Sequence, residues 1–441
     1  MASIIYHAEG VGNVLRNSIR TMTCVGKRSL AVATIIVCLT VTACGGDTSG
    51  TATPVPTATN TAAAATTAPV PATAPVATSA PAATIAPAAT TTPAATTAPT
   101  TAPSANGSAP AGTTAASSAS SGGTKLTGTP VPLVLYAAHG AAQPMADAFT
   151  KTTGIPVKIT ADSTGPLLAK IQAETNNPQW HMLWIDGAEA FASLDAQGQL
   201  LKGYAPEASL TDLGKSVQPA DKSYIPTGVT IAGTIIYDTT KVKNPPMSWQ
   251  DLLKPEYKGL VGMNNPAISG PTYPFVSGMM QYLGGEDQGK AFFKQLKDNN
   301  LHVYTTNKVT LNALASGEVS IAIIQSSAAI AATQKTPTLK TIFLPKVSVL
   351  PSNIGIDGKA PAQAQTEAKI FAEFVLSSQG QQIMREADPT GDSLYYPLVT
   401  GATPLPFLPP LASIPTQNVD PIVWGAKQNE INKWFTDNIA Q

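Results

Sequence analysis

Short apolar runs alternate with longer amphipathic stretches from residue 131 onward. The runs predict buried strands, and apolar residues spaced three and four positions apart in the stretches between them predict helices. Up to residue 194 the predicted strands are 131–137, 154–159 and 181–185, with helices at 143–150, at 167–174 and from 191 onward. This order of strands and helices predicts a parallel sheet with right-handed crossovers.

A second alternation follows a β-rich stretch at 225–238, which is interrupted by Gly228 and Gly233. Its predicted strands are 259–263, 319–324, 340–344 and 354–356, and its predicted helices are 274–283, 290–298, 307–316, 362–376 and 379–387. The pattern predicts an α/β fold with two lobes that are joined by two crossings of the chain.

The N-terminal region has the layout of a secretory signal. Lys27 and Arg28 precede an apolar run at 30–41, which ends in small residues before Cys44. A dozen apolar residues form about 18 Å of helix, too short for about 30 Å of hydrocarbon. The four residues that end at Cys44 resemble the bacterial lipobox, in which the cysteine is acylated and becomes the first mature residue. We therefore expect a lipid anchor on Cys44, with translation starting at Met1 or Met22.

Between this signal and the first strand, the chain has the composition of a flexible linker. No charged residue occurs from Thr48 to Thr124, where Thr, Ala, Pro, Ser and Gly predominate. Such a segment buries too little apolar surface to offset its chain entropy, so a disordered tether is expected. Its many hydroxyls are also possible sites for O-linked sugars.

Charge and composition exclude several classes of function. The 441 residues carry 27 Lys and Arg against 27 Asp and Glu, so the chain offers no basic face to nucleic acid. All three cysteines precede residue 45, which excludes disulfides and thiol chemistry from the folded part. The folded part has none of the metallohydrolase, phosphate-loop or serine-hydrolase motifs, and His139, His181 and His302 are scattered. We therefore expect no catalysis, no cofactor and no bound metal.

Several stretches, in order, resemble the periplasmic-type substrate-binding proteins of ABC importers, in the group that includes ferric-iron and phosphonate binders. The stretches that carry the resemblance are Asn177-Pro178-Gln179, Ser248-Trp249-Gln250-Asp251-Leu252-Leu253-Lys254-Pro255-Glu256-Tyr257-Lys258-Gly259, Asn265-Pro266 through Ser269-Gly270, Ala315-Ser316-Gly317-Glu318-Val319 and Phe374-Val375-Leu376-Ser377-Ser378-Gln379-Gly380-Gln381. The resemblance covers about residues 130–400 and implies two lobes that close by hinge motion over a ligand.

On this chain the resemblance places the two hinge crossings at about 227–231 and 345–351. The implied organisation is a signal peptide at 1–43, a tether at 44–125 and a solute-binding domain at 126–441. Within that domain the first lobe takes about 130–228 plus 350–441, and the second takes about 232–345.

One departure from the family pattern concerns iron. Ferric-iron binders of this group have adjacent tyrosines after the strand that follows the Gly-Glu turn, whereas this chain has Gln325-Ser326-Ser327 there. Hydroxyls and an amide donate hydrogen bonds to oxyanions, but they do not replace two phenolates as iron ligands. Tyr395-Tyr396 is not the same position. A second departure is His181, which stands where relatives often carry an aspartate.

The candidate ligand groups fall at the ends of predicted strands and the starts of predicted helices. Residues with hydroxyls or exposed N–H groups before a helix suit carboxylate or phosphate oxygens, and ordinary N-capping is the alternative reading. Aromatic walls are typical of small-ligand clefts, and core packing is the alternative for Tyr136 and Trp184. The candidates are Tyr136, His139, Ser163, Thr164, Trp184, Asp186, Ser269, Gly270, Thr272, Tyr273, Asn307, Gln325, Ser326 and Ser327.

These observations predict a monomeric, lipid-anchored protein that captures a small anionic solute outside the cell and delivers it to an ABC permease. Asp186 is a candidate partner for a ligand amine, which would suit a zwitterion such as an aminoalkyl phosphonate. The alternatives are an iron-chelate binder of the same family and an exported enzyme or adhesion module on the same scaffold.

Overall fold

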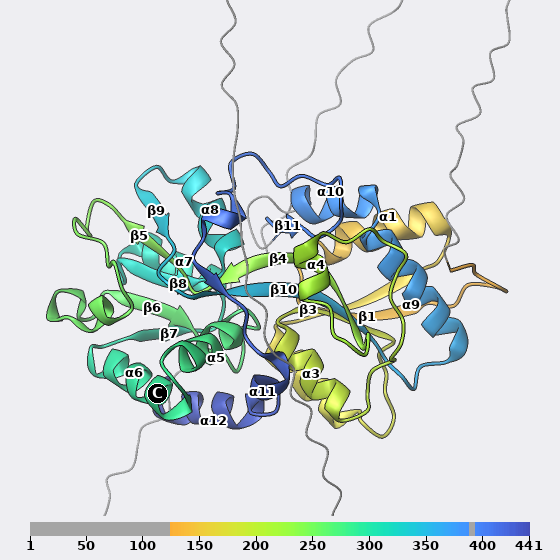
Figure 1. Cartoon of the computed structure of the whole chain (residues 1–441), viewed down its shortest axis with the longest axis horizontal. Coiled ribbons are helices and arrows are strands. Elements are labelled where there is room, and N and C mark those ends of the chain that lie inside the picture. Colours follow the sequence, from red (N-terminus) through yellow and green to blue (C-terminus); the bar gives the residue numbers. More distant parts are fainter. Residues whose placement is uncertain (1–123, 388–392) are drawn as a thin grey trace, which may run out of the picture. The chain divides into compact units, whose positions relative to one another are not determined.

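The computed structural model describes residues 124–387 and 393–441 (Figure 1). The predicted signal peptide, Cys44 and all but the last two residues of the predicted tether lie outside the described residues. Within the described part, none of the helices combines the length and the apolar character that crossing a membrane requires.

The first lobe is built on a seven-stranded sheet with the order β11-β4-β10-β3-β1-β2, and β12 pairs with β10. The strands β1, β2 and β3 are parallel, as the sequence predicts, whereas β10 runs antiparallel to both β3 and β4. The strands of this sheet are β1 (Leu133–Ala137), β2 (Val157–Ala161), β3 (Met182–Asp186), β4 (Tyr224–Ala232), β10 (Val347–Ile356), β11 (Tyr396–Pro397) and β12 (Thr416–Gln417).

Helices cover both faces of this sheet because side chains alternate along its strands. Leu133 and Leu135 of β1 join the core beneath α1 (Ala142–Thr153), α9 (Ala362–Val375) and α10 (Ser378–Glu386). Tyr136 faces the opposite core, beneath α2 (Thr164–Ala173) and α3 (Ala188–Ala196). A short helix, α4 (Asp212–Ser216), precedes β4.

The second lobe is built on a five-stranded sheet with the order β7-β6-β8-β5-β9. Its strands are β5 (Thr234–Asp238), β6 (Val261–Asn264), β7 (His302–Tyr304), β8 (Ile321–Ile324) and β9 (Leu339–Ile342). Its helices are α5 (Thr272–Tyr282), α6 (Glu286–Asp298), α7 (Asn307–Ser316) and α8 (Ser326–Lys335), with 3-10 turns at Gln250–Leu253 and Pro255–Tyr257. The structure confirms the predicted α/β class with two lobes.

The chain crosses between the lobes at two places. The first is Gly233, between β4 and β5, and the second is 343–346, between β9 and β10. The first crossing differs from the expected 227–231, which lies within β4. The second overlaps the start of the expected 345–351, whose remaining residues lie within β10. Pro351 fits inside β10 since it lies next to a bulge at Ser352 and Asn353, and its carbonyl accepts a hydrogen bond from Gly187 at 2.9 Å.

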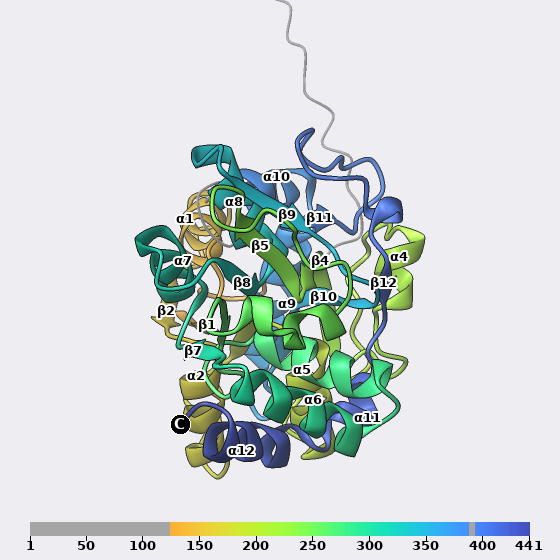
Figure 2. The ribbon, with the colours of Figure 1, turned by 90° about the vertical axis from the view of Figure 1, so that its left-hand side faces the viewer.

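The C-terminal segment packs against both lobes, although 350–441 was expected in the first. A 3-10 turn (Leu411–Ser413) precedes α11 (Pro421–Gly425), which packs on α3, and α12 (Gln428–Asn438) lies along α6 (Figure 2). The Phe435 and Phe293 ring centroids are 5.5 Å apart, and the Tyr273 hydroxyl donates to the Trp424 carbonyl at 2.6 Å. The last 20 or so residues therefore bridge the lobes on one side.

Gly233→Ala should destabilise the protein for two reasons. Gly233 has φ +83°, and a methyl there would lie 2.5 Å from the Phe275 ring. Backbone strain and overpacking together should lower the free energy of unfolding by about 2 to 4 kcal/mol, measured by urea denaturation. Gly198→Ala is the matched control, because Gly198 has φ +69° and open space around it. Equal losses in the two variants would contradict the packing argument.

Candidate ligand-binding cleft

A cleft of about 460 Å³ lies between the two lobes. The first lobe contributes the C-terminal ends of its parallel strands, where ligands bind in sheets of this kind. The lining residues are Ala137, Ala138, His139, Ala161, Asp162, Ser163, Thr164, Asp186, Ser269, Gly270, Pro271, Thr306, Asn307 and Gln325. Residues 269–271, 306–307 and 325 belong to the second lobe, so any ligand here would touch both.

The lobes touch at the edge of this cleft through two glycines. The Gly165 N–H of α2 donates a hydrogen bond to the Ile268 carbonyl at 3.1 Å. A Cβ atom on Gly165 would lie 1.9 Å from the Ala267 carbonyl oxygen, and one on Gly270 would lie 2.2 Å from the Thr164 hydroxyl. The backbones approach this closely only because neither residue has a side chain. The structure is therefore a closed form.

A buried polar network joins the lobes at the floor of the cleft. The Tyr395 hydroxyl donates to Asp186 at 2.9 Å, and the Gln325 amide donates to the other oxygen of Asp186 at 2.9 Å. Gln325 also donates to the Thr230 hydroxyl at 3.0 Å, and Asn307 donates to Gln325 at 3.4 Å. Asp186 is on β3 and Gln325 follows β8, so this carboxylate is shared between the two lobes.

His139 lines the cleft and is held between two aromatic rings. Its ring stacks between Trp184 and Tyr395, with ring centroids 4.1 and 4.8 Å away. Its Nδ1 atom accepts the Ala141 N–H at 3.1 Å, so in the neutral ring Nε2 carries the proton. Nε2 is buried and has no hydrogen-bond partner among the described residues. Burial lowers the pKa of His139 to about 3, which keeps the ring neutral near pH 7.

The cleft collects the residues that cap three helices. Ser163, Thr306 and Gln325 are the N-caps of α2, α7 and α8, and all three line the cleft. Helix N-termini carry partial positive charge and unpaired N–H groups, which suit an anion. The Ser163 hydroxyl makes no capping bond to its own helix. The lining residues include no Lys or Arg, and their carboxylates are Asp162 and Asp186.

Eight of the fourteen residues singled out from the sequence line this cleft. They are His139, Ser163, Thr164, Asp186, Ser269, Gly270, Asn307 and Gln325. Ser163, Thr164, Ser269 and Gly270 were found because a hydroxyl-rich turn precedes a helix. Asp186 was found because it ends a strand at the ligand-facing edge of the sheet. The expectation for these residues remains a prediction about ligand contact.

Of the remaining six residues, four have structural partners instead. The Tyr136 hydroxyl donates to Glu174 at 3.0 Å on the far face of the sheet, and Tyr273 is held by Trp424. Trp184 lies behind His139, and its indole N–H donates to the Ser352 hydroxyl at 3.1 Å. The Ser326 hydroxyl accepts the Ile231 N–H at 3.0 Å, which fixes α8 to β4. The structure also places Thr272 and Ser327 outside the lining.

Tyr395 belongs to the buried network beneath the cleft, and the sequence analysis did not place it there. It is 1% exposed, stacks on His139 and contacts Asp186 from 209 positions away along the chain. No local pattern around Tyr395 indicates that contact. Thr306, in contrast, is an N-cap that accepts the Val309 N–H at 3.4 Å, and its position before a predicted helix could have revealed it.

The model of the family described as bacterial extracellular solute-binding protein matches residues 144–406. The chain belongs to this family. It is 26% identical over 249 residues to a putative 2-aminoethylphosphonate-binding periplasmic protein of Salmonella paratyphi A, covering 54% of this chain and 70% of the relative. It is also 26% identical over 296 residues to an Fe(3+)-binding periplasmic protein of Serratia marcescens, covering 62% and 80%. Solute-binding proteins of ABC importers bind small solutes outside the cytoplasm and deliver them to a permease.

Solved solute-binding proteins share the fold. The periplasmic binding protein AfuA from Actinobacillus pleuropneumoniae, with exogenous fructose-6-phosphate bound, superposes with a TM-score of 0.63 at 21% identity, covering 70% of this chain and 98% of AfuA. Iron-bound HitA from Pseudomonas aeruginosa gives a TM-score of 0.59 at 22% identity, covering 69% and 99%. The two-lobe solute-binding architecture predicted from the sequence is thereby confirmed.

Gly165→Ala should hold the lobes apart. The added methyl would overlap the Ala267 carbonyl, which belongs to the other lobe, so opening relieves the clash without disturbing either core. Spin labels on Gln172→Cys and Lys308→Cys, both exposed, should report a longer distance in this variant than in the parent. Lys151→Ala, an exposed change on α1, should leave the distance unchanged. An unaltered distance in Gly165→Ala would contradict the contact.

The acid stability of the protein should depend on His139. Because its folded pKa is depressed, the unfolded state binds a proton below about pH 6.5 while the folded state does not, so stability is lost as pH falls from about 6.5 toward about 3. His139→Phe retains the stack but removes this loss. As the pH falls from 7 to 4, the free energy of unfolding of His139→Phe should rise relative to that of the parent. The rise should be at most about 1.4 kcal/mol per pH unit. Parallel pH curves for the two proteins would contradict this assignment.

Proposed function

We propose that the chain is the lipid-anchored binding protein of an ABC importer for a small phosphonate or phosphate monoester that also carries an amino group. The observation that carries the proposal is the donor set of the cleft. It combines three helix N-caps, several hydroxyls and the His139 N–H with two carboxylates and no lining Lys or Arg. We propose further that the chain performs no catalysis and acts as a monomer.

The phosphonate end of the ligand suits the rim formed by both lobes. Ser163 and Thr164 lie at the start of α2, and Ser269 and Gly270 face them from the second lobe. A tetrahedral oxyanion accepts hydrogen bonds from several directions at once, so hydroxyls and N–H groups on both sides can be satisfied by one group. The neutral His139 ring adds a donor whose Nε2 has no other partner among the described residues. Binding there would favour the closed form.

The amino end of the ligand suits the carboxylates. A bare dianion would lie near Asp162 and Asp186 without a lining cation to offset them. An ammonium group on the same ligand supplies a positive charge and lowers the net negative charge of the ligand. The Salmonella relative is described as a putative 2-aminoethylphosphonate-binding protein, and that compound belongs to this class of ligand.

The residues of this chain do not favour a bare ferric ion. Gln325 is held by Asp186 and Thr230, and Ser326 is held by the β4 backbone. The Tyr395 hydroxyl donates a hydrogen bond to Asp186. This bond disfavours the phenolate form that a hard trivalent cation needs as a ligand. Within the described residues no group of three or more His, Cys, Asp or Glu could hold a metal ion. An iron chelate stays the alternative ligand, because an Fe(3+)-binding periplasmic protein is among the relatives.

The predicted lipid anchor fits this role. Acyl chains on Cys44 would keep the protein at the outer face of the membrane. A coil as long as the predicted tether averages about 50 Å from end to end, which gives the binding domain room to reach a permease. Mass spectrometry of the mature N-terminus tests the anchor, and an unmodified Cys44 would contradict it.

A thermal-shift comparison tests the ligand class. We expect 2-aminoethylphosphonate to raise the melting temperature, because a ligand at 100 times its dissociation constant contributes about 2.7 kcal/mol to the folded state. Three other compounds are compared for their effect on the melting temperature. Fructose-6-phosphate carries a phosphate without an amine, ethanolamine carries an amine without a phosphate, and ferric citrate supplies iron. Stabilisation by ferric citrate or ethanolamine alone, or by none of the four, would contradict the proposal.

Ser163→Ala tests the placement of the oxyanion. Ser163 lines the cleft and its hydroxyl has no capping role, so its removal should leave the melting temperature of the unliganded protein unchanged. Loss of one hydrogen bond to a charged ligand should weaken binding about tenfold or more, measured by calorimetry. Thr152→Val, an exposed change on α1, is the matched control and should bind like the parent. Equal affinity in all three proteins would refute the placement.

A further inference from the structure

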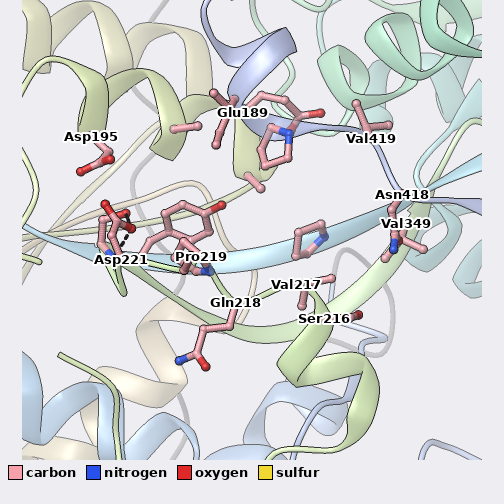
Figure 3. A pocket seen from close by; sticks show the side chains of 18 of the residues that line it. Glu189, Asp195, Ser216, Val217, Gln218, Pro219, Asp221, Val349, Asn418 and Val419 are labelled. Carbon is pink, nitrogen blue, oxygen red and sulfur yellow. Dashed lines mark hydrogen bonds between the residues drawn. The ribbon is translucent and has the colours of Figure 1, made fainter. Parts of the chain in front are cut away.

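A second cavity of about 550 Å³ lies outside the cleft (Figure 3). Its walls are formed by α3, residues 216–224, strand β10 and the C-terminal segment 418–422. It shares no lining residue with the cleft, so it is a separate place on the molecule. Its volume falls in the range of about 300 to 1,000 Å³ that small-molecule sites occupy.

The walls of this cavity are largely apolar. Figure 3 shows Val349 and Val419 at one end of the cavity, and Asp195 and Asp221 at the other. Ala192, Pro219 and Ile422 add further apolar surface. Ile422 is 77% exposed. A ligand with an apolar body would cover this surface and gain from its burial.

Every lining residue that can carry a full charge near neutral pH is acidic. These residues are Glu189, Asp195 and Asp221. Lys202 pairs with Asp195 at 2.8 Å and with Asp221 at 2.9 Å, so these two carboxylates are already offset by a cation. Glu189 is different. It is 3% exposed, accepts a hydrogen bond from the Ser277 hydroxyl at 3.3 Å and makes no ion pair among the described residues.

A buried carboxylate without a cation is unfavourable, and burial raises the pKa of Glu189 to about 7. An ammonium group beside it would compensate the charge without a change elsewhere in the fold. The Tyr224 ring also lines the cavity and offers a face to a cation. An anionic ligand would lie beside Glu189 with no Lys or Arg in the lining, which is unfavourable.

We propose that this cavity is a second binding site, for a small organic amine with an apolar body whose ammonium group pairs with Glu189. The apolar body lies against Val217, Pro219 and Val349. Because Ser277 belongs to α5 of the second lobe and Glu189 to α3 of the first, the occupied site lies next to a direct contact between the lobes.

Ligand-observed NMR and calorimetry with 2-phenylethylamine test the proposal on the intact chain. Two comparison compounds retain the ring and change the head group: 2-phenylethanol is neutral, and 3-phenylpropionate is anionic. We expect the amine to bind about tenfold or more tightly than the alcohol, and the acid not to bind. Equal binding of all three compounds, or binding of none, would overturn the proposal.

Two variants place the site. Glu189→Gln retains the side-chain shape and an acceptor for Ser277, so it should fold and should abolish the preference for the amine over the alcohol. Ala220→Trp changes an exposed lining residue and should block the cavity to both. Asp186→Asn, in the cleft, should leave amine binding unchanged. Loss of amine binding in Asp186→Asn with retention in Glu189→Gln would assign the amine to the cleft and overturn the second site.

Discussion

The antiparallel pairing of β4 with β10 is the constraint on which the rest of the structure depends. The two strands are paired from Ser348 and Ala232 at one end to Gly355 and Tyr224 at the other, and each continues into a crossing between the lobes. Backbone hydrogen bonds keep these strands side by side, so the lobes can rotate about their ends but cannot slide past each other. Because of this restriction, the cleft residues of the two lobes come together in the same arrangement each time the lobes close.

A carboxylate shared between the two lobes lies at the floor of the cleft. Asp186 from the first lobe is held by Tyr395 of the same lobe and by Gln325 of the second. Both donors are neutral side chains, and they fix the position of the carboxylate at the floor of the cleft. Under the proposed function, helix N-termini and hydroxyls would attract an oxyanion in place of lysine or arginine. Such a surface can bind a molecule with both charges without strongly attracting simple anions.

Closure depends on residues that contribute no side chain. Gly165 and Gly270 allow the backbones of the two lobes to approach, and Gly233 permits the turn between β4 and β5. The C-terminal segment adds a further connection, because α11 packs on α3 while α12 packs on α6. The hinge therefore works within limits set on one side by this segment and on the other by the glycine contact.

The sequence by itself determined the fold class, the parallel start of the first sheet and the hydroxyl-rich turns, because each of these depends on local periodicity or on a cap next to a helix. It failed for α8, whose residues Ser326 to Ala331 are buried with little contrast between faces, and for the C-terminal helices, whose docking depends on distant partners. Only the tertiary structure decided that Tyr395 meets Asp186, that Ser326 supports β4, and that Glu189 is buried without a cation. Those facts depend on contacts between residues 88 to 209 positions apart, and no local pattern records such distances.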